Sequence, residues 1–240
     1  MSKKKLNLSE ALAGVDLESV VKESIRKAAP GLVKESYVSQ PKSYDQVSEF
    51  VSEKTKEAHT ELYRKYVENL NQVSVELDTS ERATDKVNSS HSQFRSLKLD
   101  ETYNLNAKWL HELFFANCFD PHSELYMESL AFMRFQRDFG TFEAWQKDLM
   151  ACALTCGNGW AVCGYNVHLQ RYVNTVVSNH SQDVMIGLYP VVVIDMWEHS
   201  YSRDYLNDKK SYLVAMMREI NWNVVEERVQ KAEQIAEVVK

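Results

Sequence analysis

The chain has 240 residues, 44% of them hydrophobic and 26% charged, so it holds enough apolar side chains for a sizeable core in one domain or two small ones. With only 7 glycines and 4 prolines, it is neither collagen-like nor a Pro-rich disordered chain, and helices are favoured. The formal net charge of −6 predicts no general attraction to nucleic acid or to an anionic membrane surface.

The N-terminal sequence and the longest apolar stretch indicate where in the cell the protein is expected. The stretch 185–194 is interrupted by Pro190 and has about half of the ~20 residues that a membrane-spanning helix needs. The first residues lack a long apolar core, and Glu10 comes early, which fits neither a secretory signal nor a transit peptide. We therefore expect a cytoplasmic protein with no membrane partner.

The four cysteines are too few for a disulfide framework in a chain of this length. Cys152, Cys156 and Cys163 lie in an apolar stretch and lack the CxxC pair typical of zinc sites. Buried reduced thiols are therefore a better interpretation than a zinc cluster.

The N-terminal half is predicted to be helical. Residues 1–40 form an extension, in which apolar residues at helical spacing from Leu17 to Ala28 stop before Pro30. A long helix is predicted from about Ser52, its N-cap, to about Leu77. The polar residues 78–100 then predict a surface loop, and a second helix covers 104–118.

The C-terminal half mixes both kinds of element. A third helical pattern spans 140–155, and helices return from Tyr201 to an amphipathic end. Between them, three short runs separated by turn-forming residues predict strands at 160–165, 172–177 and 191–194. Helices first and a small sheet later describe an α+β chain of two halves.

One pair of residues has the spacing of metal ligands. Asp195 and His199 are four residues apart, and on a helical turn such residues share one face and can hold one ion. A carboxylate oxygen with an imidazole nitrogen suits Fe, Mn or Zn better than Ca or Mg. The spacing is a weak signal by itself and depends on its neighbours. His91, His122 and His168 follow turns or lie in polar loops, and we interpret them as ordinary histidines.

Four segments in order carry a family resemblance. The first is PxxYD from Pro41, continued by SxxTxExH up to His59 and by YVxNLN from Tyr66. The others are YNLNAKWLHELFFANCFDP, then RDFGTFEAWQKDLMACALTCGNGWAVCGYN, then IDMWEHSYSRDYLNDKKSYL followed by INW. The last is similar to the D-x-W-E-H-A-Y signature of the iron/manganese superoxide dismutases. Together these segments, over residues 41–228, resemble that family.

The resemblance implies an N-terminal helical hairpin followed by a C-terminal domain with a small three-stranded antiparallel sheet flanked by helices. The implied parts are an N-terminal extension (1–40), a hairpin domain with the first two metal ligands (41–135), an α/β domain with the last two (136–228) and a C-terminal helical tail (229–240).

The resemblance also implies one Mn or Fe ion per chain, with the ligands His59, His111, Asp195 and His199. His59 and Tyr66 are seven residues apart where the family has eight, so either His59 or Ala58 takes the first ligand position. Seven residues of a regular helix end about 20° short of two full turns, whereas eight overshoot by about 80°, which favours His59. If Ala58 faces the site instead, no metal is expected.

Two polar residues are implied to act beside the ligands. Tyr66 matches the tyrosine that gates the substrate channel and joins the proton relay. His180 is similar to a histidine that hydrogen-bonds the metal-bound solvent, with an ordinary loop histidine as the alternative. The glutamine typical of iron enzymes, four residues before His111, is replaced by Ala107.

Further positions depart from the family pattern or concern a second subunit. The aromatic residues implied around the metal are Phe115, Trp160 and Trp197. Phe115 and Val162 stand where tryptophan is usual, and the histidine usual between the first ligand and Tyr66 is missing. Glu198 and Tyr201 match residues that bridge two subunits, which implies a homodimer.

The implied function is Mn- or Fe-dependent dismutation of superoxide to oxygen and hydrogen peroxide. The alternative is a catalytically lapsed protein of the same fold with a structural role in a large assembly, such as a mitochondrial ribosome or a virion. Such a subunit would be assembly-bound through residues 1–40 and the C-terminal helix. A hydrolytic zinc enzyme lacks a candidate general base.

Overall fold

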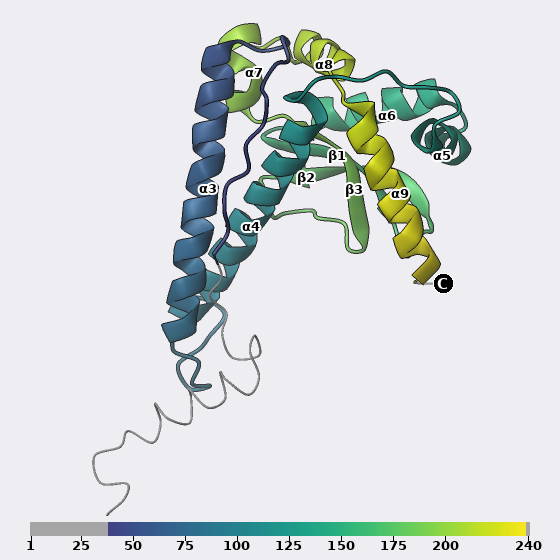
Figure 1. Ribbon diagram of the computed structural model, residues 1–240. Helices are drawn as coiled ribbons and strands as arrows, with labels where there is room; N and C mark the ends of the chain where they lie inside the picture. Colours follow the sequence, from purple (N-terminus) through teal and green to yellow (C-terminus); the bar gives the residue numbers. More distant parts are fainter. Residues whose placement is uncertain (1–37, 239–240) are drawn as a thin grey trace, which may run out of the picture. The chain divides into compact units, whose positions relative to one another are not determined.

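The computed structural model describes residues 38–238, and Figure 1 shows how the elements follow one another. The helix expected between Leu17 and Ala28 lies outside the described residues. The described chain divides into two compact units, one of Val38 and 71–98 and the other of 39–70 and 99–238. All candidate site residues belong to the second unit.

Two long helices, α3 (Glu53–Thr79) and α4 (Gln93–Cys118), form the N-terminal hairpin that the resemblance implies. The predicted start of α3 is confirmed, since the Ser52 carbonyl accepts the N–H groups of Thr55 and Lys56 at 3.0 and 3.1 Å. The predicted loop 78–100 is wrong over its last residues, because α4 begins at Gln93 rather than Asn104. Of residues 93–100 only Leu97 is buried, so the polar composition reflects an exposed helix surface and not a loop.

The C-terminal domain contains a three-stranded antiparallel sheet, as implied. Its strands are β1 (Gly159–Asn166), β2 (Arg171–Ser178) and β3 (Leu188–Asp195), in the order β2-β1-β3. All three predicted strands are confirmed; β1 and β2 are each two residues longer than expected, and β3 is four residues longer. The central strand β1 is buried along its whole length. In its register with β3, Trp160 lies opposite Asp195, so the two residues meet at one end of the sheet.

Helices flank this sheet (Figure 1): α5 (Leu130–Phe139), α6 (Phe142–Thr155), α7 (Glu198–Tyr205), α8 (Lys209–Arg218) and α9 (Trp222–Val238). Gly140, with φ of +88°, ends α5, and the Thr141 hydroxyl then accepts the Ala144 N–H at 3.0 Å to begin α6. The third predicted helix therefore starts at Phe142 and not at Gly140. Among the helices of residues 38–238, none has the length and apolar character that a membrane crossing requires.

The cysteines behave as the apolar sequence around them predicts. Cys118, Cys156 and Cys163 are buried, Cys152 is half-buried, and all four are free thiols. Burial raises the pKa of the Cys163 thiol above its usual range, which keeps it protonated and a poor metal ligand. Among the described residues, the group of side chains that could hold a metal ion includes none of these cysteines.

A buried polar clamp ties α4 and α9 to the strand that ends at Asp195. The Arg228 guanidinium donates to Asn117 Oδ1 at 2.9 Å and to the Val191 carbonyl at 3.1 Å. Asn117 Oδ1 also accepts the Val193 N–H at 3.1 Å. Burial lowers the pKa of Arg228 to about 10, so the side chain stays charged at neutral pH and depends on these acceptors.

We predict that Asn117→Leu lowers the free energy of unfolding by about 3 kcal/mol, because it leaves the buried Arg228 guanidinium and the Val193 N–H short of an acceptor. Urea titration followed by circular dichroism measures this. The double variant Asn117→Leu/Arg228→Met should be less destabilised than Asn117→Leu alone. An unchanged unfolding midpoint in Asn117→Leu would contradict the role of the clamp.

Candidate metal centre

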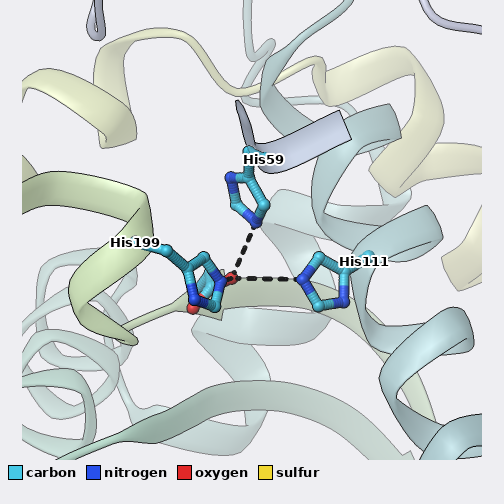
Figure 2. A group of neighbouring side chains, drawn as sticks. His59, His111 and His199 are labelled. Carbon is cyan, nitrogen blue, oxygen red and sulfur yellow. Dashed lines mark hydrogen bonds and ion pairs between the residues drawn. The ribbon is translucent and has the colours of Figure 1, made fainter. Parts of the chain in front are cut away.

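Four side chains from four separate elements converge in the second unit. His59 comes from α3, His111 from α4, Asp195 from the last position of β3 and His199 from the first turn of α7. Figure 2 shows the three imidazole rings pointing towards one carboxylate oxygen. Segments up to 140 residues apart in the chain thus meet at one point.

The distances place one potential ligand atom of each residue within 4.8 Å of every other. His59 Nε2 and His199 Nε2 each lie 3.1 Å from Asp195 Oδ2, and His111 Nε2 lies 3.9 Å from it. Donor atoms that share a transition ion at about 2.1 Å stand about 3 to 4 Å apart, depending on the angle between the bonds. The three distances to Asp195 Oδ2 match such a shared ion.

The choice between His59 and Ala58 is settled by their orientation. His59 is 1% exposed and contacts the other site rings, with its ring centroid 5.1 Å from that of His111 and 4.7 Å from that of His199. Ala58 is exposed. The helical rotation argument is confirmed, and an alanine at the ligand position is excluded.

A hydrogen bond at Nδ1 of His111 leaves the lone pair of Nε2 available for a cation. Its Nδ1–H donates to the Ala107 carbonyl at 2.6 Å, so the lone pair is on Nε2. That Nε2 is buried and has no hydrogen-bond partner among the described residues. Burial, together with the nearby His59, holds the pKa of His111 well below its usual range, and the ring stays neutral. A buried lone pair without a donor is well suited to a metal ion.

Asp195 supplies the negative charge of the site. Burial by itself raises its pKa, but the neighbouring His199 charge and the hydrogen bonds with His199 and His59 hold the pKa well below its usual range. Its second oxygen, Oδ1, accepts the Trp197 N–H at 2.8 Å. Its backbone carbonyl accepts the Tyr212 hydroxyl at 2.9 Å. The carboxylate is therefore ionised and held in position from three sides.

The donor set fits iron or manganese. Three imidazole nitrogens and one carboxylate oxygen suit a redox-active first-row ion better than calcium or magnesium, which prefer oxygen ligands. Three of the four residues are buried, whereas His199 is 24% exposed and marks the side of the site nearest to solvent. His122, by contrast, is exposed, with its Nδ1 3.6 Å from Glu219 Oε2, as expected of an ordinary histidine.

Beside the four ligands lies a hydrogen-bonded group that includes both predicted polar residues. The Trp160 indole N–H donates to His180 Nδ1 at 3.0 Å, and His180 Nε2 lies 3.0 Å from the Tyr66 hydroxyl. His180 is fully buried, and burial lowers its pKa to about 4. It is therefore neutral at physiological pH. The ring is held in the interior, unlike that of a free loop histidine.

Aromatic rings surround the imidazoles at the predicted positions. The Phe115 ring is 4.9 Å from that of His59, and the Trp160 ring is 4.9 Å from that of His111. Trp197 stacks on His180 at 4.9 Å. The small Val162 side chain and His180 both border a mostly apolar cavity of about 120 Å³.

Two tyrosines near the ligands were not identified as site residues from the sequence. Tyr63, four residues after His59, is fully buried and donates its hydroxyl proton to Glu112 Oε1 at 2.8 Å. Tyr103, eight residues before His111 on α4, contacts both Tyr66 and His180. In the stretch between His59 and Tyr66, where the usual histidine is missing, the structure thus has a tyrosine turned towards a carboxylate.

The two residues implied at a subunit interface differ in their exposure to solvent. Glu198 is exposed at the start of α7, beside the partly exposed His199. Tyr201 is only 3% exposed, and its ring packs 5.5 Å from that of Tyr212.

Comparison with known proteins agrees with this site. A family model described as the iron/manganese superoxide dismutases, C-terminal domain, matches residues 129–228. The chain is 34% identical over 205 residues to a superoxide dismutase [Fe] of Aquifex aeolicus (strain VF5), which covers 84% of this chain and 95% of the relative. It is 33% identical over 201 residues to a superoxide dismutase [Fe] of Aquifex pyrophilus, covering 83% of this chain and 92% of the relative.

A manganese relative is also similar: superoxide dismutase [Mn] 1 of Halobacterium salinarum is 28% identical over 193 residues, which are 80% of this chain and 93% of the relative. The chain belongs to the iron/manganese superoxide dismutase family. Its four ligand positions are intact, and the cluster of His59, His111, Asp195 and His199 is the binding site for Fe or Mn.

We predict that the purified protein contains about one iron or manganese ion per chain and that His111→Ala or Asp195→Ala loses most of it, because each removes a buried donor. Inductively coupled plasma mass spectrometry measures the content. His122→Ala, which changes an exposed histidine, is the matched control and should keep its metal. Full metal content in both site variants would contradict the assignment.

Proposed function

We propose that the protein is a superoxide dismutase. The observation that carries the proposal is the convergence of three imidazole nitrogens and one ionised carboxylate oxygen at a single buried point. When bound, an iron or manganese ion supplies one-electron chemistry, by which one superoxide is oxidised to oxygen and a second, with two protons, is reduced to hydrogen peroxide.

The protein's own residues would bind the anion and provide protons. Tyr66 keeps its proton at neutral pH, because burial and the neighbouring Tyr103 raise its pKa above the usual range. His180 lies within hydrogen-bond distance of the Tyr66 hydroxyl and is itself fixed by Trp160. We therefore assign proton delivery to Tyr66 and His180. The rings of Phe115, Trp160 and Trp197 would exclude bulk water from the ligands.

A structural subunit without catalysis is the competing hypothesis. It gained support from the missing residue in the first ligand helix, and that support is gone because His59 occupies the site. The loss of the usual histidine between His59 and Tyr66 still favours it. A chain that binds metal but does not dismute superoxide would support the hypothesis of a structural subunit.

We also propose a homodimer in which α7 meets its counterpart. Glu198 is exposed directly beside His199, the one ligand that is partly open to solvent. A second subunit placed there would cover the exposed edge of the site. The cytoplasmic location and a larger assembly through residues 1–40 and the C-terminal helix stay predictions, which cell fractionation tests.

We predict that the metal-loaded protein dismutes superoxide and that Tyr66→Phe slows turnover at least about tenfold without loss of metal, because it removes a proton donor. Stopped-flow absorbance of superoxide decay measures the rate. Tyr126→Phe removes an exposed hydroxyl outside the site and should leave the rate unchanged. Equal rates for Tyr66→Phe and the unmodified chain would rule out the assigned role.

We predict that the unmodified chain sediments as a dimer in analytical ultracentrifugation and that Glu198→Ala raises the dimer dissociation constant at least about tenfold, through loss of a charged contact in the interface. Glu143→Ala, on the exposed surface of α6, is the control. A monomeric unmodified chain at all concentrations would refute the proposed dimer.

A further inference from the structure

The ligands and the assigned proton route leave unused an apolar cavity of about 120 Å³ between α4 and the sheet. Most of its wall is aliphatic and comes from α4 and from all three strands: Leu110, Leu113, Val162, Val177, Leu188 and Pro190. Such a wall offers a polar molecule few hydrogen-bond partners, so the cavity suits an apolar occupant.

The cavity extends from the protein surface to the neighbourhood of the ligands. At its inner end lie the buried side chains of Val162, Val177 and His180, whereas Trp109 and Val184, at its outer end, are exposed. The His180 ring centroid is 5.9 Å from that of the ligand His111. A molecule at the inner end is therefore separated from a ligand ring by one side chain.

The polar groups of the lining offer little to an anion. Both nitrogens of His180 are engaged by other residues, because Nδ1 accepts the Trp160 indole N–H at 3.0 Å and Nε2 lies 3.0 Å from the Tyr66 hydroxyl. Asn106 also lines the cavity but is only half-buried. An anion at the inner end would thus lose its hydration without gaining a charged partner.

The volume limits the size of the occupant. An engineered apolar cavity of about 150 Å³ in another protein stays dry and takes up benzene or xenon. The present cavity is slightly smaller, at about 120 Å³, so it admits small gas molecules and excludes organic molecules much larger than benzene.

We propose that this cavity is a binding site for dioxygen, the apolar product of the reaction. The inference rests on the proposed function, which releases dioxygen beside His111 and His180. Dioxygen is neutral and apolar and gains free energy by leaving water for an apolar wall. Superoxide is charged and hydrogen peroxide needs hydrogen bonds, so the same wall disfavours both. The cavity thereby takes up the product and rejects the anionic substrate.

Xenon and iodide are matched probes for the test, because they have the same number of electrons and differ in charge. Crystals of the protein as purified are pressurised with xenon or soaked in sodium iodide, and anomalous diffraction locates each probe. Further crystals are pressurised with dioxygen. We expect a xenon peak beside Val162 and Val177, dioxygen density at the same place and no iodide peak there.

Val162→Phe and Val177→Phe each fill the inner end, from β1 and from β2, and should lose the xenon peak. Two variants are used because an added ring can overpack the core. Val214→Phe adds the same ring on the exposed surface of α8 and is the matched control, which should keep the peak. Xenon retained by either folded cavity variant overturns the inference.

The unmodified chain decides the question even if neither cavity variant folds. No xenon or no dioxygen at the inner end overturns the inference, and so does an iodide peak there. Superoxide decay is measured on the same preparation. Dismutation without uptake of xenon overturns the inference alone, whereas uptake of xenon and dioxygen without dismutation contradicts the proposed function and leaves a site for apolar gases.

Discussion

A single carboxylate oxygen shared by three imidazoles is the constraint on which the rest of the site depends. Asp195 Oδ2 has two imidazole nitrogens at 3.1 Å and a third at 3.9 Å, and Asp195 is fully buried. A buried carboxylate costs several kcal/mol unless positive charge or hydrogen bonds offset it. Hydrogen bonds with His59 and His199 offset part of that cost, and a cation between the four atoms would also give His111 Nε2 a partner, which it lacks among the described residues. The arrangement is therefore suited to a metal ion.

The fold fixes the position of that oxygen by holding the strand β3, which ends at Asp195. β3 pairs with the fully buried β1, which places Trp160 opposite Asp195. The Asn117–Arg228 clamp holds the middle of β3 against α4 and α9. The same Trp160 orients His180 through its indole N–H. One residue thus links the position of the carboxylate to the hydrogen-bonded group beside the ligands.

The parts of the site that follow local periodicity were predictable from the sequence. The rotation of a regular helix selected His59 over Ala58. The four-residue spacing of Asp195 and His199 indicated a pair of ligands, but the expected helical turn was wrong, because Asp195 is the last residue of β3 and only His199 lies on α7. Tyr103 was missed because it lies between the loop predicted at 78–100 and the helix predicted from Asn104, so no helix face was assigned to it. Only the earlier start of α4 places it on the same helix as His111. The clamp of Asn117 and Arg228 joins residues more than 100 positions apart, which no local pattern reveals.

Anomalous X-ray diffraction at the iron and manganese absorption edges, from crystals of the protein as purified, tests the central claim most directly. The account predicts one strong peak per chain, bonded to the three histidine Nε2 atoms and to an Asp195 oxygen. No peak at either edge, or a metal that leaves His59 uncoordinated, would contradict it.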